Sequence, residues 1–133
     1  MNYLINNENI CSILKNIRKE NYFSINDMSI YFKKDVKYIE NTEKDNRYIR
    51  LNYLYLFVKK FKLIFTINNY DIILPYKDEI FYEFCKEAKV LARNLKIDLH
   101  SAGRLIKLNT PIYPTFSLLS RFSNFYKISM EIS

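Results

Sequence analysis

The chain has 133 residues, of which 49% are hydrophobic and 26% are charged, so it can bury one modest core or two very small ones. No apolar run reaches the roughly 18 residues that a membrane-spanning helix requires, and the N-terminus lacks the charged start and apolar stretch of a signal peptide. The formal charge of +7 favours an anionic partner such as nucleic acid. We therefore expect a cytoplasmic protein.

Residue types that support catalysis or metal binding are scarce. Cys11 and Cys85 have no CxxC or Cys/His spacing, so we expect reduced thiols. A single histidine, His100, cannot build a two-histidine metal site, and the single glycine, Gly103, excludes a glycine-rich phosphate loop. No serine lies in a nucleophile-elbow motif. We expect no enzyme activity, no metal site and no cofactor.

The positive charge is concentrated in the first half. Residues 1–66 carry 12 Lys and Arg against 7 Asp and Glu, a net charge of +5, whereas residues 67–133 carry 9 against 7, a net charge of +2. Lys, Asn, Ile, Tyr and Phe are also the residues that an A+T-rich genome encodes most readily. Basicity alone is therefore weak evidence for a nucleic-acid partner.

Apolar spacing predicts helices throughout the first half. A first helix is expected where apolar residues recur at steps of three and four, at Ile10, Ile13, Leu14 and Ile17. Ser24 and Asp27 carry the start signal of a second helix, in which Met28 faces inward. Asp35 gives the same signal for a short third helix, with Ile39 as its clearest buried position. A fourth helix begins near Arg50 and carries a strong apolar stripe at Leu51, Leu54, Phe57, Val58 and Phe61.

The second half also favours helices. Segment 63–74, LIFTINNYDIIL, fits either a β-hairpin that turns at Asn68-Asn69 or a short helix capped by Thr66; we favour the helix because its surroundings are helical. Segment 78–97 predicts a helix of about four turns with one apolar face formed by Ile80, Phe84, Ala88, Leu91 and Leu95. Shorter helices are expected over 98–108 and 115–128, so the predicted fold class is all-α.

Four helices separated by turns of about three residues, with the second and third both short, have the layout of a helix-turn-helix unit. Residues 10–63 resemble the phage-repressor-like (XRE/Cro) family without gaps, through the segments ILKNIRKENYFS, SINDMSIYFKK, DVKYIENTEKDNRYI and LNYLYLFVKKFKL. Met28-Ser29 stands where the family has a Leu-Ala pair. The resemblance implies a helix-turn-helix domain over residues 1–65, with an ion pair between Arg18 and Glu43 in its interior.

The resemblance also implies which residues meet DNA. The third helix would enter the major groove, where Lys37 can donate to guanine, Asn41 can pair with adenine and Val36 can contact the thymine methyl group. Basic residues around them would contact phosphates: Lys33, Lys34, Lys44 and Arg47. Two positions depart from the family. Ile25 replaces a phosphate-anchoring glutamine, and Lys33 replaces the turn glycine, so Lys33 must adopt a left-handed backbone or reshape the turn.

The second half of the chain echoes the first. When the chain is aligned with itself at one constant offset, Leu91-Ala92 aligns with Met28-Ser29 and Asp98 aligns with Asp35. With two more residues inserted, Phe122 aligns with Phe57. A degenerate second copy would span about residues 76–128 of a helical domain at 66–133, with a second candidate DNA face at His100, Ser101, Arg104 and Lys107. One chain would then read two half-sites. Without a true repeat, the second half is a dimerisation platform and symmetry arises from two chains.

The leading hypothesis is a sequence-specific DNA-binding transcriptional regulator, a repressor, of a low-GC bacterium or mobile element, which binds double-stranded DNA as a homodimer. The alternative is a protein–protein interaction module or antagonist that kept the helix-turn-helix scaffold and no longer binds DNA. Asp35 and Glu40 add negative charge beside the third helix and permit this alternative. So do tyrosines, which suit protein interfaces, at Tyr31, Tyr38, Tyr48, Tyr53 and Tyr55.

Overall fold

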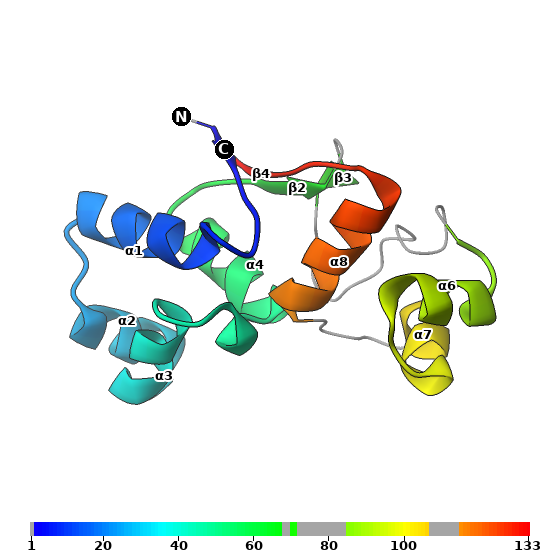
Figure 1. Ribbon diagram of the computed structural model, residues 1–133. Helices are drawn as coiled ribbons and strands as arrows, with labels where there is room; N and C mark the ends of the chain where they lie inside the picture. The colour runs from blue at the N-terminus through cyan, green and yellow to red at the C-terminus, as the bar shows by residue number, and fades with distance from the viewer. Residues whose placement is uncertain (1, 68–69, 72–84, 107–114) are drawn as a thin grey trace.

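The computed structural model describes residues 2–67, 70–71, 85–106 and 115–133. These residues form seven α-helices, one 3-10 helix and a four-stranded antiparallel sheet (Figure 1). The chain is thus mostly helical, as predicted, but it is not all-α. The correction lies in the short strands, which the helical periodicity of the neighbouring segments did not reveal.

The first half runs from a short strand through four helices to a second strand. Its elements are β1 (Tyr3–Leu4), α1 (Ile10–Glu20), α2 (Ile25–Phe32), α3 (Val36–Thr42), η1 (Asn46–Tyr48), α4 (Leu51–Lys60) and β2 (Phe65–Ile67). The Asp27 N–H donates to Ser24 Oγ at 3.0 Å and the Ser24 N–H donates to Asp27 Oδ2 at 2.9 Å, which closes a capping box at the start of α2. Asp35 caps α3 by accepting the Tyr38 N–H at 2.8 Å. Both predicted helix starts are confirmed.

The second half contains β3 (Tyr70–Asp71), α6 (Ala88–Leu95), α7 (Leu99–Ile106), α8 (Phe116–Tyr126) and β4 (Met130–Ile132). The helix predicted over 78–97 is wrong at residues 85–87, because Glu87 is extended with φ −106° and ψ 119°. The buried Cys85 thiol donates to the Glu87 carbonyl at 3.3 Å, a local bond within the non-helical segment that precedes α6. The remaining residues of the predicted apolar face, Ile80 and Phe84, lie outside the described residues.

The sheet has the order β1-β4-β2-β3. Thr66 pairs with Asp71 and Ile67 pairs with Tyr70 in the β2–β3 ladder. The helix favoured for segment 63–74 is therefore wrong, and the alternative of two antiparallel strands is correct for its described residues. Burial alternates along β2, since Phe65 and Ile67 are buried and Thr66 is only partly so, which is the pattern of a strand with one face on the core.

The two halves share one hydrophobic core. Its largest buried side chains come from both halves and include Met28, Leu54, Phe57, Phe116 and Phe122. The sheet also joins them, because β4 at the end of the chain lies between β1 and β2, so the two termini lie close together (Figure 1). The domain boundary expected after residue 65 falls inside β2.

The elements of the second half recur at constant offsets from those of the first. Helices α6 and α7 follow α2 and α3 at one offset, and α8 and β4 follow α4 and β2 at an offset that is larger by the two inserted positions. The left-handed residues recur as well: Lys33 and Lys96 have φ of 55° and 56°, and Lys62 and Lys127 have φ of 57° and 54°. The described part of the second half thus repeats the order and spacing of the first, as the sequence echo predicts.

Candidate nucleic-acid interface

A three-residue turn connects α2 to α3. The turn begins at Lys33, which is left-handed with φ 55° and ψ 43°, so the lysine adopts the left-handed backbone, one of the two outcomes expected for this position. The Lys33 and Lys34 N–H groups both donate to the Ser29 carbonyl, which satisfies one of the last carbonyls of α2. This closure fixes the direction in which α3 leaves the turn.

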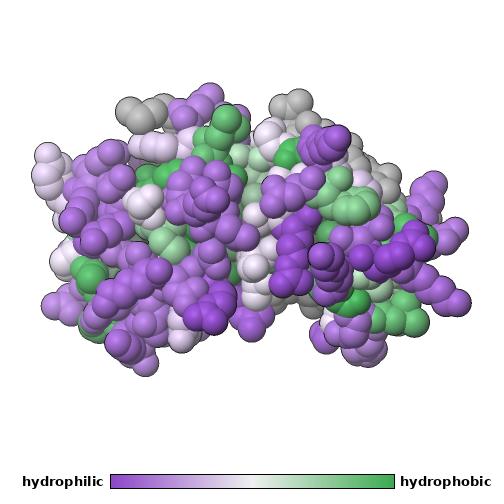
Figure 2. Space-filling model, in the orientation of Figure 1, coloured by the Kyte–Doolittle hydropathy of each residue, from purple (hydrophilic) through white to green (hydrophobic). Residues whose placement is uncertain are grey.

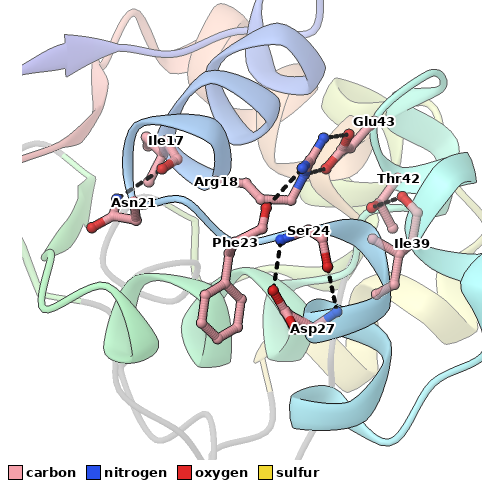
Figure 3. Close-up of polar contacts among 9 residues, drawn as sticks. All are labelled: Ile17, Arg18, Asn21, Phe23, Ser24, Asp27, Ile39, Thr42 and Glu43. Carbon is pink, nitrogen blue, oxygen red and sulfur yellow. Dashed lines mark hydrogen bonds and ion pairs between the residues drawn. The ribbon is translucent and has the colours of Figure 1, made fainter.

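An interior ion pair anchors the end of α3 to α1 (Figure 3). Arg18 Nε donates to Glu43 Oε2 at 2.6 Å and Arg18 Nη2 donates to Glu43 Oε1 at 3.0 Å, while Nη1 donates to the Phe23 carbonyl at 2.8 Å. The two charged side chains are 8% and 7% exposed. The expected pair between Arg18 and Glu43 is present, and it ties α3 to the turn that precedes α2.

The inner face of α3 is apolar and its outer face is open to solvent. Ile39 is fully buried, and the buried Thr42 donates its hydroxyl to the Ile39 carbonyl at 2.7 Å. On the outer face, Val36 is 37% exposed, Lys37 is exposed and Asn41 is partly exposed. The three residues predicted to read bases therefore share the accessible side of the helix.

Basic side chains flank α3 at both ends. Lys33 and Lys34 precede the helix, Lys44 follows it, and all three are exposed. Lys34 Nζ lies 5.2 Å from the centre of the Tyr38 ring, a contact that orients the ammonium group beside the first turn of α3. Figure 2 shows that this region, over α2 and α3 at the lower left, is mainly hydrophilic with hydrophobic groups exposed among the polar ones.

The fourth predicted phosphate contact, Arg47, is engaged within the protein. Its Nε and Nη2 donate to the Asp45 carboxylate at distances from 2.6 to 3.1 Å, and these hydrogen bonds lower the pKa of Asp45. The Arg47 side chain is nevertheless 80% exposed. Sequence reasoning missed this partner, although Asp45 lies only two positions away along the chain. A phosphate would have to share Arg47 with Asp45.

The predicted second face lies on α7. His100 and Arg104 are exposed, whereas Ser101 is partly exposed and committed to the helix start: its N–H and Oγ donate to the Asp98 carboxylate at 2.8 and 2.9 Å. The hydrogen bond from the Ser101 backbone N–H is the largest cause that lowers the pKa of the Asp98 carboxyl, and the bond from the Ser101 hydroxyl adds to it. Asp98 thus repeats the capping role of Asp35, its equivalent in the first half. Lys107, the fourth predicted member of this face, lies outside the described residues.

One exposed residue of this face was missed by the sequence reasoning. Leu99, the first residue of α7, is 51% exposed and is the equivalent of Val36, the first residue of α3. The same offset that aligned Asp98 with Asp35 could have identified it. Both helices therefore present an apolar side chain to solvent at the same position.

Comparisons of the chain with family models, curated proteins and solved structures returned no match. Within the described parts of the chain, no helix is long and apolar enough to cross a membrane, and no group of three or more His, Cys, Asp or Glu residues is placed to hold a metal ion. Cys11 and Cys85 are free thiols. The geometry and charges of the α3 and α7 faces thus provide the basis for a functional proposal.

Proposed function

We propose that the protein is a sequence-specific DNA-binding transcriptional regulator, a repressor, in which α2 and α3 form a helix-turn-helix unit of the phage-repressor type. The observation that carries the proposal is the accessible outer face of α3, the proposed recognition helix, with Val36 and Lys37 exposed and Asn41 partly exposed. A helix fits the major groove of B-DNA, where lysine can recognise guanine, asparagine adenine and a methyl group thymine.

The support beneath α3 suits this task. Base recognition requires side chains that are held in place before DNA arrives, because ordering them on binding would cost affinity. The Asp35 cap fixes the start of the helix, Ile39 fixes its middle, and the Arg18–Glu43 pair fixes its end. Such a helix can present its outer face as a rigid surface.

The charges around α3 also favour DNA. Lys33, Lys34 and Lys44 can neutralise phosphates and release counterions, which supplies affinity that does not depend on sequence. The negative charge of Asp35 opposes this attraction, but its carboxylate accepts the Tyr38 N–H at the start of α3, where the helix dipole favours an anion. The acidic residue thus has a structural role.

The alternative, a protein interaction module, rests partly on the tyrosines near α3 and α4. Tyr53 is only 4% exposed and packs against Phe32 and Tyr38, with ring centres 5.3 and 5.6 Å apart. Tyr31 and Tyr48 are exposed by about half, at 50% and 47%. Because these tyrosines are divided between core and surface, they favour this alternative less than the basic side chains favour DNA.

The test is selection of bound duplexes of about 30 base pairs from a random pool, a length that holds two half-sites, followed by titration at two salt concentrations. Lys37→Ala combined with Asn41→Ala should weaken binding to the selected duplex by about tenfold or more and leave binding to unselected DNA nearly unchanged. The matched control is Lys15→Ala with Asn16→Ala, which removes the same residue types from the exposed surface of α1. Equal losses for the two variants, or no salt-sensitive binding at all, would refute the proposal.

A further inference from the structure

We infer that a single chain is an internal pseudo-dimer that reads two inverted, unequal half-sites of one DNA duplex, one with α3 and the other with α7. The inference rests on the proposed function. It names the form of the DNA target and replaces the homodimer expected from sequence with one chain per target.

The β2–β4 ladder shows how the two halves are related. Thr66 pairs with Glu131, and these two residues occupy equivalent positions, each in the middle of its strand. On either side the partners are exchanged: Phe65 pairs with Ile132, and Ile67 pairs with Met130. A segment that pairs antiparallel with its own copy is the signature of a two-fold axis, as in the isologous interface of a homodimer.

A second contact between equivalent residues lies before α4 and α8. Arg50 and Thr115, the residues that immediately precede these two helices, form an antiparallel bridge, and the Phe116 N–H donates to the Ile49 carbonyl at 2.8 Å. Two separate self-pairings at the same offset define one axis that passes through both.

The outer strands obey the same symmetry. On one edge of the sheet, β1 pairs with β4 through Tyr3 with Ile132 and Leu4 with Glu131. On the other edge, β3 pairs with β2 through Tyr70 with Ile67 and Asp71 with Thr66, the equivalent positions. The order β1-β4-β2-β3 is therefore symmetric about its centre.

The two-fold relation determines how the candidate recognition helices are presented. Figure 1 shows α3 and α7 at opposite ends of the molecule, both on the side remote from the sheet. Two-fold related recognition helices match inverted half-sites whose centres are about 34 Å, one helical turn, apart on one side of the duplex. One chain thus supplies the pair of helices that a repressor otherwise obtains from two subunits.

The two helices do not carry the same residues, so the half-sites should differ. Three equivalent pairs distinguish the faces: Val36 and Leu99, Lys37 and His100, Asn41 and Arg104. Asparagine suits adenine, whereas arginine suits the O6 and N7 acceptors of guanine. The turns that precede α3 and α7 are alike, since each begins with an exposed, left-handed lysine, Lys33 in the first and Lys96 in the second. The target is therefore an inverted repeat with an adenine-reading half and a guanine-reading half.

The experiment uses the full chain and the duplex selected from the random pool. Native mass spectrometry should give one chain per duplex. Duplexes in which each half-site is scrambled in turn are then titrated with two double variants, Lys37→Ala/Asn41→Ala and His100→Ala/Arg104→Ala. Each variant should lose about tenfold in affinity for the intact target. Scrambling the half-site that its altered helix would read should then cause no further loss of affinity, and this half-site should differ between the two variants.

The two proposals fail in distinguishable ways. Two chains per duplex, or an α7 variant that binds and discriminates like the parent chain, would overturn the internal pseudo-dimer and leave the α3 face as a DNA-binding surface. Absence of binding to any duplex would overturn the proposed function and this inference with it. All four substituted side chains are at least partly exposed, so unfolding curves that match the parent chain provide the control for folding.

Discussion

Removal of either member of the Arg18–Glu43 pair should destabilise the protein strongly, whereas removal of both should not. In Glu43→Ile the Arg18 guanidinium, only 8% exposed, loses two of its three hydrogen bonds and keeps only the bond to the Phe23 carbonyl. An uncompensated buried charge of this kind costs about 3–5 kcal/mol, a large share of the roughly 5–15 kcal/mol that stabilises a typical domain.

The double variant Arg18→Met/Glu43→Ile removes the charges together. Replacement of a buried pair by apolar side chains of similar volume is often neutral or stabilising. The second half of the chain supplies a precedent, because Ile106, partly buried against the core, stands at the position equivalent to Glu43. We expect the double variant to lie within about 1 kcal/mol of the parent chain.

Urea unfolding followed by circular dichroism gives the free energies for the parent chain, both single variants and the double variant. Single losses near 3 kcal/mol or more combined with a nearly neutral double variant would establish a coupled interior pair. Single losses below about 1 kcal/mol that add up in the double variant would show that the two side chains are ordinary solvated charges, and the anchoring of α3 would need another explanation.

Three further predictions concern the rest of the chain. Lys127→Gly should raise the free energy of unfolding by roughly 1 kcal/mol in thermal unfolding, because Lys127 is left-handed with φ 54°. As the control, Lys15→Gly inside α1 should lower the free energy of unfolding by roughly 0.7 kcal/mol. A loss of stability in both variants would contradict the reasoning. Burial raises the pKa of Tyr53 from 10.0 to about 12. The part of the free energy of unfolding that depends on the neutral phenol is therefore fully present below pH 10, and it should fall by up to about 2.7 kcal/mol as the pH rises through 12. Tyr53→Phe should remove this part of the alkaline decline in unfolding titrations, and an unchanged decline would exclude it. Lys34→Ala should reduce the slope of log affinity against log salt by about 1 if Lys34 contacts a phosphate, and an unchanged slope would remove it from the interface.

Local sequence signals predicted the helical framework well. The three- and four-residue spacing from Ile10 to Ile17 placed α1 on the core, and Ser24 and Asp35 marked the starts of α2 and α3. These signals succeed because they depend on interactions within one or two helical turns. The Arg18–Glu43 contact joins two helices that are distant in sequence and was predicted only through the family resemblance.

The sheet could not be predicted in the same way. Strands β2 and β4 are very short, and their pairing joins positions from opposite halves of the chain, such as Thr66 and Glu131. A helical cap was a reasonable interpretation of Thr66 from its neighbours, but its actual partners include one in a distant part of the chain. Tertiary pairing overrides local preference most easily in such short segments.

The candidate site was predicted more completely in α3 than in α7. Val36, Lys37 and Asn41 lie on one accessible face, as the resemblance implied. In α7, Ser101 is expected on the DNA face but is bonded to the Asp98 cap, and the exposed Leu99 was overlooked. The helix boundary of α7 decides which residue is first, and periodicity alone leaves such boundaries uncertain by a residue or two.

The most direct test of DNA contact by α3 and α7 is a nuclear magnetic resonance titration of the uniformly labelled chain with the selected duplex. We predict that the largest amide shift changes cluster at residues 33–41 and 96–104 and saturate together at one duplex per chain. Changes confined to the sheet or to the exposed surface of α1, or no saturable change at all, would contradict this prediction.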